Sequence, residues 1–338
     1  MAILVTGAAG FIGYHVADRL LARGETVIGI DNLNDYYSVA LKRDRIEDLA
    51  TRRGEAFRFL PIDFSNHEAL DRGLEGHGID RIVHLGAQAG VRYSIENPRA
   101  YIQANVVGHL NILEFARHRG VAHLAYASSS SVYGGNTSLP FRVEDRVDHP
   151  VSLYAATKKA DELMSETYAH LYRLPQTGLR FFTVYGPWGR PDMALFLFTK
   201  KILAGEPIQV FNHGKHKRSF TYIDDIVEGV VRVLDQPPVA DPAWDSLNPD
   251  PATSSAPYRL FNIGAEQQVE LLRYIEVLEQ CLGRKAIMEM LPLQPGDVPD
   301  TEADVTDLAR VVGYQPKVTV EEGVRNFVDW YRGYNGVL

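Results

Sequence analysis

The N-terminal stretch, residues 1–31, constrains the fold more than any other part of this chain. The apolar run Ala2–Thr6 leads directly into a glycine-rich turn at residues 7–13, and a helical pattern follows that ends at residues 23–24. A second apolar run, residues 26–30, ends in Asp31. Strand, glycine turn, helix and strand in this order predict a βαβ unit that opens a parallel sheet.

The glycine turn has the spacing G-x-x-G-x-x-G, with Gly7, Gly10 and Gly13. In nucleotide-binding turns, glycines allow a tight bend, a close approach of backbone N–H groups to a pyrophosphate, and close helix–strand packing. Asp31 would accept hydrogen bonds from the ribose hydroxyls and repel a 2′-phosphate, which predicts NAD rather than NADP. A turn that only packs a helix is the alternative, and the flanking strand, helix and Asp31 favour the nucleotide site.

The overall composition narrows the class of protein. A length of 338 residues suits one large α/β domain with a smaller partner domain. The net charge of −8 argues against nucleic acid or an anionic membrane as the main partner, and no run approaches the ~20 apolar residues that span a bilayer. The histidines occur singly, so we expect no metal site. Because residues 1–6 are already strand-like and the chain has one cysteine, we expect a cytoplasmic protein.

Further apolar runs predict more parallel strands. Residues 57–62 lead to Asp63, and residues 81–85 lead to small residues that begin with Gly86. Asp63 either accepts a hydrogen bond from adenine or caps the next helix. The small residues allow a second close approach of the backbone to the cofactor.

The rest of the fold is predicted more coarsely. Residues 122–127 predict a strand that ends in a serine run, and residues 259–264 predict a last strand of the main sheet. The charged residues 41–53 are typical of a solvated helix. Residues 236–257 contain six prolines and predict an exposed loop.

Tyr154 and Lys158 form the clearest catalytic candidate. Residues four positions apart lie on one face of a helix, so the ammonium of Lys158 would stabilise the ionised phenol of Tyr154. Tyr154 would then serve as a base near neutral pH. The spacing alone is not specific in a chain with 17 tyrosines. A serine hydroxyl from residues 128–131 would orient the substrate oxygen.

These motifs occur in the order found in one enzyme family, and the chain resembles the extended short-chain dehydrogenase/reductases. Within them it is similar to the sugar-nucleotide 4-epimerases. The specific stretches are 87–94, 128–134, RFFTVYGPWGRPDMA at 180–194, FTYIDDIV at 220–227 and QPGDV at 294–298. The resemblance implies an α/β fold, a Rossmann-type doubly wound parallel sheet with a smaller C-terminal substrate domain. Residues 1–182, with 224–236 and 259–264, would form the NAD-binding domain, and residues 183–338 mainly the substrate-binding domain.

The resemblance also implies roles for individual residues. Catalysis would rest on Tyr154, Lys158, Ser129 and Ser131. NAD would be bound by Gly7, Gly10, Phe11, Ile12, Gly13, Asp31, Asn32, Asp63, Phe64, Leu85, Gly86, Ala87, Gln88, Asn105, Tyr154 and Lys158. The UDP-sugar would be bound by Arg92, Ser129, Ser130, Ser131, Thr183, Arg190, Gln209, Phe211, Arg218 and Asp297.

Two departures from sister families narrow the substrate. Dehydratases and decarboxylases of this kind carry an acid just before Val-Tyr-Gly, whereas this chain has Ser130 and Ser131. Galactose-type epimerases usually have Asn in place of Thr183 and lack the sequence around Arg190. Thr183 and Arg190 therefore resemble a carboxylate clamp, because a guanidinium can bind a carboxylate bidentately. The alternative for Arg190 is a solvated loop arginine.

The resemblance thus implies an NAD-dependent C4 epimerase of UDP-glucuronate. A UDP-glucose/galactose 4-epimerase, a UDP-glucuronate decarboxylase and a non-catalytic NAD-sensing scaffold protein are the alternatives. It also implies a homodimer, in which helices at residues 98–119 and 153–172 pair across a two-fold axis.

Overall fold

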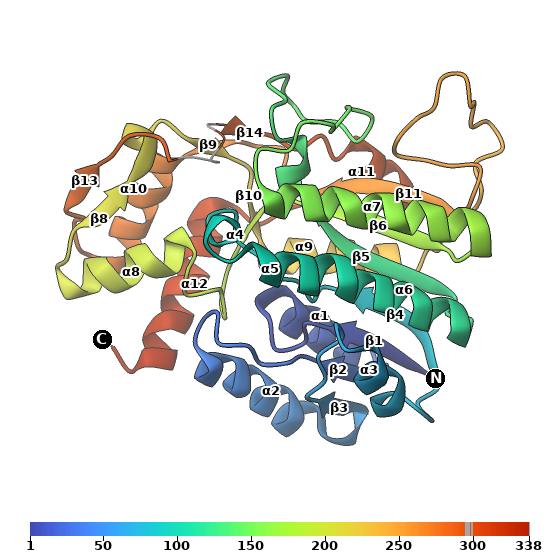
Figure 1. The fold of residues 1–338 in the computed structure, drawn as a ribbon. Coiled ribbons are helices and arrows are strands. Elements are labelled where there is room, and N and C mark those ends of the chain that lie inside the picture. The colour runs from blue at the N-terminus through green and yellow to red at the C-terminus, as the bar shows by residue number, and fades with distance from the viewer. Residues whose placement is uncertain (295–297, 299, 338) are drawn as a thin grey trace.

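The computed structural model describes residues 1–294, 298 and 300–337. Within these residues, the centre of the fold is a seven-stranded sheet whose neighbouring strands all run parallel, in the order β11-β6-β5-β4-β1-β2-β3 (Figure 1). Its strands are β1 (Ala2–Thr6), β2 (Val27–Ile30), β3 (Phe57–Leu60), β4 (Ile79–His84), β5 (His123–Ser129), β6 (Gln176–Phe181) and β11 (Tyr258–Ile263). The direction in which successive strands are added reverses between β1 and β4. Folds of this kind bind their ligands next to such a point, at the carboxyl ends of the strands.

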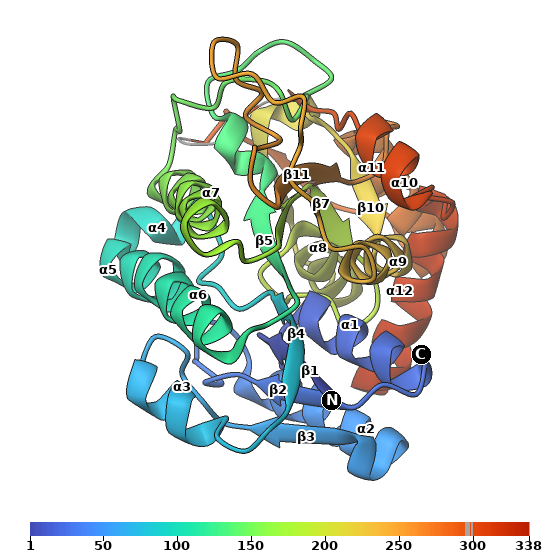
Figure 2. The same ribbon diagram turned by 90° about the vertical axis from the view of Figure 1, so that its right-hand side faces the viewer.

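Helices cover both faces of the sheet, which confirms the predicted doubly wound α/β fold (Figure 2). One face carries α1 (Phe11–Ala22), α2 (Val39–Arg53) and α9 (Ile223–Leu234). The other carries α3 (His67–Gly73), α6 (Gly108–Arg119) and α7 (Leu153–Tyr172). α7 begins where the Ser152 hydroxyl accepts a hydrogen bond from the N–H of Ala155, the preferred arrangement at a helix start.

The segment before α6 departs from a regular α-helix. The short helices α4 (Tyr93–Glu96) and α5 (Pro98–Tyr101) are followed by a π-helical segment, η2 (Ile102–Val107), which runs directly into α6. The predicted single helix at 98–119 is therefore continuous in direction but changes its hydrogen-bond pattern. π-helical turns are frequent at functional sites, and this one carries Asn105.

Strand β6 was not predicted from the sequence, although it lies between β5 and β11 and is wholly buried. Its sequence, QTGLRF, carries polar side chains that look unsuited to a buried strand. Each of them has at least one hydrogen-bond partner, and only the amide oxygen of Gln176 has none among the described residues. Gln176 donates to the carbonyl of Ser165 at 2.7 Å, and the hydroxyl of Thr177 lies 3.0 Å from the ring of His123. Because buried polar groups cost little when hydrogen-bonded, the strand tolerates them.

Helix α2 is only partly the solvated helix that was expected. Leu41 and Leu49 are buried, and so are Lys42 and Arg45. The ammonium of Lys42 donates to the backbone carbonyl and the side-chain oxygen of Asn34 at 2.6 and 2.8 Å. The charged side chains on this face of α2 are therefore structural.

The C-terminal elements gather at one end of the sheet (Figure 1, left). They include α8 (Ala194–Ala204), α10 (Leu271–Leu282), α12 (Val320–Asn335) and two parallel strands, β8 (Ile208–Val210) and β13 (Met288–Met290). The remaining elements of this part of the chain are β7 (Thr183–Tyr185), η4 (Phe211–Gly214), β9 (Lys217–Arg218), β10 (Phe220–Tyr222), β12 (Val269–Glu270), β14 (Asp300–Thr301) and α11 (Thr306–Val312). The stacked rings of Phe220 and Tyr274, 4.2 Å apart, join β10 to α10.

Two predictions about connections are confirmed, the second of them in part. The segment after the loop returns to the main sheet as β11, which pairs with β6. Residues 236–257, all of them described, form a series of turns rather than a regular element, and residues 239–251 are exposed or half-buried. The prediction of an exposed loop is wrong for the end of the segment, where Ala252, Ser254 and Ala256 are buried.

Candidate active site

The glycine turn lies between β1 and α1, beside the loop that follows β4. Gly7 has a φ of +68°, and a Cβ on it would lie 2.8 Å from the Cα of Gly86. A Cβ on Gly13 would lie 2.0 Å from the carbonyl oxygen of Gly7, so α1 packs directly on the turn. The first turn of α1, with Phe11 and Ile12, has the backbone donors that a helix start leaves unpaired. This geometry fits a pyrophosphate.

Asp31 follows β2 at the same edge of the sheet. Its carboxylate is nearly buried and accepts a hydrogen bond from the N–H of Leu33 at 2.8 Å, and burial raises its pKa. Asn32 donates to Asp63 at 3.0 Å, and Asp63 also accepts from the N–H of Ser65 at 2.9 Å. Asp63 thus stabilises a local turn, but the alternative that it caps the next helix is wrong, because the cap of α3 is Asn66, whose side chain accepts a hydrogen bond from the N–H of Ala69. The contact of Asp63 with adenine stays a prediction.

The loop after β4 is held from both sides. The hydroxyl of Thr6 accepts a hydrogen bond from the N–H of Gly86 at 3.0 Å. The side-chain amide of Asn105 accepts from the N–H of Gln88 at 2.8 Å and donates to its carbonyl at 3.1 Å. A Cβ on Gly86 would lie 2.5 Å from the ring of Phe64, so a side chain at this position would clash. The loop also contains the predicted cofactor residues Leu85 and Ala87.

Tyr154 and Lys158 lie one turn apart in the first half of α7. The buried ammonium of Lys158 donates to the carbonyl of Ala127 at 2.9 Å and to the carboxylate of Asp161 at 3.0 Å. The ring of Tyr154 packs edge-on against Tyr101, with 6.0 Å between ring centroids. The predicted pair is thus placed on one helix, with the cation anchored by the end of β5.

The predicted substrate serines form a turn at the end of β5. The hydroxyl of Ser129 accepts a hydrogen bond from the N–H of Ser131 at 3.1 Å, at the start of the 3₁₀ turn η3 (Ser130–Tyr133). Ser130 and Ser131 line a cavity together with Thr183 from β7 and Arg218 from β9. The fold therefore brings four predicted substrate residues from three separate segments to one cavity.

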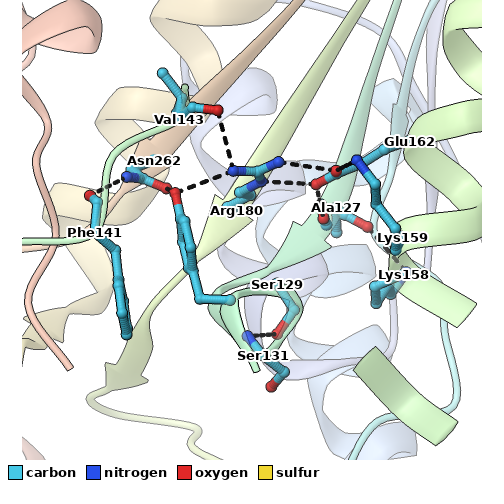
Figure 3. Close-up of polar contacts among 12 residues, drawn as sticks. Ala127, Ser129, Ser131, Phe141, Val143, Lys158, Lys159, Glu162, Arg180 and Asn262 are labelled. Carbon is cyan, nitrogen blue, oxygen red and sulfur yellow. Dashed lines mark hydrogen bonds and ion pairs between the residues drawn. The ribbon is translucent and has the colours of Figure 1, made fainter. Parts of the chain in front are cut away.

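A buried ion pair stands behind this serine turn (Figure 3). Arg180 donates to Glu162 at 2.8 and 3.0 Å, and the hydroxyl of Ser128 donates to the same carboxylate at 2.7 Å. Arg180 also donates to the phenol of Tyr133 at 3.1 Å, and that phenol donates to Asn262 at 2.7 Å. Burial alone would raise the pKa of Glu162, but the guanidinium holds it below its usual value. The network joins α7 to β5, β6, β11 and η3.

Arg190 is paired within the protein. Its guanidinium donates to Asp192 at 3.0 and 2.5 Å, and Asp192 also accepts a hydrogen bond from Tyr36 at 3.2 Å. Among the described residues that line the cavity, Thr183 is present and Arg190 is not. A substrate carboxylate therefore has to displace Asp192 or share the guanidinium with it, and the clamp stays a prediction.

The predicted contacts with the rest of the substrate are more dispersed. The guanidinium of Arg92 lies over the ring of Phe211, 5.2 Å from its centroid. Gln209 is exposed on β8, and Arg218 donates to the carbonyl of Val298. Asp297 lies outside the described residues.

Arg45 is a site residue that sequence analysis did not single out. Its fully buried guanidinium donates to the carbonyl of Ala9 at 2.7 Å, the phenol of Tyr37 at 2.9 Å and the carbonyl of Trp188 at 2.5 Å. Trp188 has a φ of +60°, which is unusual for a residue other than glycine. Arg45 thus joins the glycine turn to the loop that carries Arg190.

Fold and site together define a Rossmann-type, dinucleotide-dependent enzyme with a tyrosine–lysine pair. In the part of the chain that the structure describes, no three His, Cys, Asp or Glu side chains are placed to share a metal ion. None of the described helices is long and apolar enough to cross a membrane. Residues 3–245 match the model of the NAD dependent epimerase/dehydratase family, and the chain belongs to this family.

Relatives within the family differ in substrate. A probable UDP-glucuronate 4-epimerase of Rhizobium meliloti is 49% identical, over 98% of this chain and 97% of the relative. The crystal structure of UDP-glucuronic acid 4-epimerase from Bacillus cereus, in complex with UDP-glucuronic acid and NAD, matches with a TM-score of 0.86 at 32% identity, covering 99% of this chain and 100% of that one. A UDP-glucose 4-epimerase of Thermotoga maritima, with UDP-glucose, matches with a TM-score of 0.85 at 29% identity, over 99% and 100%. The fold alone does not separate the two substrates.

Proposed function

We propose that this protein interconverts UDP-glucuronate and UDP-galacturonate by NAD-dependent epimerisation at C4. The observation that carries the proposal is the placement of Tyr154 and Lys158 on α7 beside the serine turn. The similarity to UDP-glucuronate 4-epimerases over nearly the whole chain supports the same activity.

The chain's own residues supply proton transfer and orientation. NAD, when bound, takes a hydride from C4 of the sugar and gives it back. Tyr154 removes the O4 proton and later returns it, while Lys158 stabilises the negative charge on the phenol. Ser129 and Ser131 orient O4. The 4-keto sugar would rotate in the site before C4 is reduced again. The configuration at C4 would therefore invert, and no oxidant would be consumed.

Several features of the protein fit NAD. Gly7 and Gly13 leave no room for a side chain, which keeps the turn open to a pyrophosphate. Asp31 would accept hydrogen bonds from the ribose hydroxyls, and Asn105 holds the loop that follows β4. These residues would bind the dinucleotide across the switch point of the sheet.

The proposed substrate specificity rests on the carboxylate at C6. Thr183 and Ser131 line one cavity, and Arg190 lies a few residues beyond Thr183 in the chain. An acid is missing at Ser130 and Ser131, where decarboxylases carry one, which favours epimerisation over loss of carbon dioxide.

The test is incubation of the purified protein with UDP-glucuronate or UDP-glucose, followed by chromatography of the nucleotide sugars. We expect UDP-galacturonate from the first and little product from the second. A UDP-pentose product would instead identify a decarboxylase, and efficient conversion of UDP-glucose a galactose-type epimerase. NAD binding with no conversion of either sugar would indicate the sensing or scaffold function.

The proposal includes a homodimer that acts in the cytoplasm. Large apolar side chains are exposed on neighbouring helices, namely Leu110 on α6 and Leu163, Leu171 and Tyr172 on α7. Pairing of these helices with a second copy would bury them. A single cysteine leaves no intrachain disulfide, as is usual in a reducing compartment.

We also propose the two-domain division. α9 packs against α1 and β11 pairs with β6, which supports assigning residues 224–236 and 259–264 to the NAD-binding domain 1–182. The substrate-binding domain would then comprise most of residues 183–338.

A further inference from the structure

Asp161 is a buried carboxylate that neither the cofactor site nor the mechanism above uses. It follows Lys158 by three residues on α7, and its Oδ2 lies 3.0 Å from the ammonium of Lys158. Both side chains are at most 3% exposed. The second oxygen, Oδ1, has no hydrogen-bond partner among the described residues. Burial raises the pKa of Asp161 to about 6, against the opposing effect of Lys158.

The next residue, Glu162, shows what a structural carboxylate looks like in the same helix. Glu162 receives hydrogen bonds from Arg180 and from Ser128 on other elements. Asp161 has only its pair with Lys158 on its own helix. A buried ion pair with an unsatisfied oxygen contributes little to stability. We therefore look for the role of Asp161 in its effect on Lys158.

We propose that Asp161 is a positioning residue that acts through Lys158 and sets the pH at which Tyr154 becomes a base. The carboxylate holds one N–H of Lys158, and the carbonyl of Ala127 holds another. The negative charge partly cancels the field of the ammonium at the phenol. The proposal rests on the use of Tyr154 as the base in the proposed function.

The titratable groups packed around Asp161 and Lys158 keep the same charge between pH 5 and 8. Burial lowers the pKa of His84 to about 3 and that of His109 well below its usual value, so both rings are neutral above pH 5. Burial raises the pKa of Tyr126, which stays neutral, and Glu162 stays ionised beside Arg180. Of the described groups that face Asp161 from α6, β4 and β5, none changes charge between pH 5 and 8.

The sign of the effect follows from electrostatics. Without the negative charge of Asp161, the phenolate of Tyr154 is more stable and the ammonium of Lys158 is less stable. Above about pH 6, where Asp161 is ionised in the wild type, both limbs of the pH profile of kcat therefore move to lower pH. Asp161 follows Tyr154 by seven residues, about 10 Å along the helix, and at an effective dielectric constant of about 20 one unit charge at that distance displaces the phenol limb by about one pH unit.

The test uses Asp161→Asn in the full-length enzyme. Asparagine keeps the shape, and its amide oxygen can still accept a hydrogen bond from Lys158. Asp161→Ser removes the charge with a smaller side chain and serves if the first variant does not fold. The matched control is Asp307→Asn, because Asp307 pairs with Arg310 at the same three-residue spacing on an exposed helix.

We expect the pH profile of kcat to shift by about one unit to lower pH in Asp161→Asn and to stay in place in Asp307→Asn. A profile that superimposes on that of the wild type would overturn the proposal. So would a uniform loss of kcat at every pH, which would show a merely structural role.

A second measurement does not depend on turnover of any sugar. Tyrosinate absorbance is titrated in the NAD-bound protein, and the curve of its Tyr154→Phe counterpart is subtracted to isolate Tyr154. We expect the midpoint to fall in Asp161→Asn. An unchanged midpoint would refute the role of Asp161. A wild-type enzyme that converts no UDP-sugar would refute the proposed function and leave this titration valid.

Discussion

Tyr154 is the residue on which the proposed chemistry depends most directly. Tyr154→Phe removes the phenol but keeps the ring that packs against Tyr101. We expect turnover of UDP-glucuronate to fall by ~10²-fold or more, the usual effect of losing a general base, with NAD affinity unchanged. Steady-state kinetics and NAD titration measure both. Near-normal turnover would exclude Tyr154 as the base.

We expect Asp31 to decide the choice of dinucleotide. Its nearly buried carboxylate repels a 2′-phosphate, so we expect the protein to bind NAD at least ~10-fold more tightly than NADP. Asp31→Ser should reduce this ratio by removing the charge. Calorimetric titration with each dinucleotide tests the prediction. Equal affinities in the wild type would place Asp31 away from the ribose.

Arg190 should protect the intermediate as well as bind the substrate. The 4-keto sugar is a β-keto acid, which loses carbon dioxide when its C5–C6 bond aligns with the ketone. A charge-assisted hydrogen bond is worth ~1.5 to 3 kcal/mol, so losing that restraint changes partition by ~10- to 100-fold. We expect Arg190→Ala to weaken UDP-glucuronate binding and to release some UDP-4-keto-pentose, which leaves reduced nicotinamide.

Mass spectrometry and nicotinamide absorbance detect the two products. The control is Asp192→Asn, which removes the internal partner of Arg190 and should retain UDP-glucuronate binding. If Arg190→Ala binds UDP-glucuronate as tightly as the wild type, Arg190 is not the clamp.

The buried ion pair of Arg180 and Glu162 joins β6 to α7. Arg180→Met leaves the buried carboxylate of Glu162 with only the Ser128 hydroxyl and the ammonium of Lys159 as partners, and we expect unfolding to become easier by about 3 to 5 kcal/mol at pH 7. Urea unfolding measures this. In the double variant with Glu162→Leu most of the loss should be recovered, because no buried charge remains. A single variant as stable as the wild type would contradict the prediction.

The pH dependence of that stability has opposite signs in the two proteins. In the wild type the pKa of Glu162 is lowered, so the contribution is present above the unfolded value near 4.3 and is lost as pH falls through the folded one. In Arg180→Met, burial is opposed only by Lys159 and Ser128, and we expect the pKa of Glu162 to rise. Acidification should then stabilise the variant relative to the wild type, which urea titrations between pH 4 and 7 can test.

Helix α2 and strand β6 show where sequence patterns failed to predict burial. Leu41, Arg45 and Leu49 recur every four residues, so Arg45 lies on the apolar face of α2. The four-residue spacing indicates a buried helix face. The many charged residues of the segment instead led to the prediction of a solvated helix. Strand β6 was missed for a related reason, because the partners of Gln176 and Arg180 lie on other elements.

At the scale of the whole molecule, the exposed apolar residues of α7 predict assembly. Leu163→Asp and Leu171→Asp place charges in the proposed interface, and we expect either change to convert a dimer into a monomer. Light scattering gives the mass. Leu247→Asp is the matched control, since Leu247 is 93% exposed in the loop at 236–257. A wild-type monomer, or a dimer unaffected by both changes, would exclude this interface.

The sequence by itself determined the βαβ start, the glycine turn, the acid at Asp31 and the Tyr154–Lys158 spacing. These features are set by interactions between near neighbours, whose periodicity can be read along the chain. Only the tertiary structure decided that Asp192 meets Tyr36, that Arg45 reaches Trp188, and that Asp161 is buried. Burial and pairing depend on which distant segments the sheet brings together, and a buried charge takes its properties from those partners.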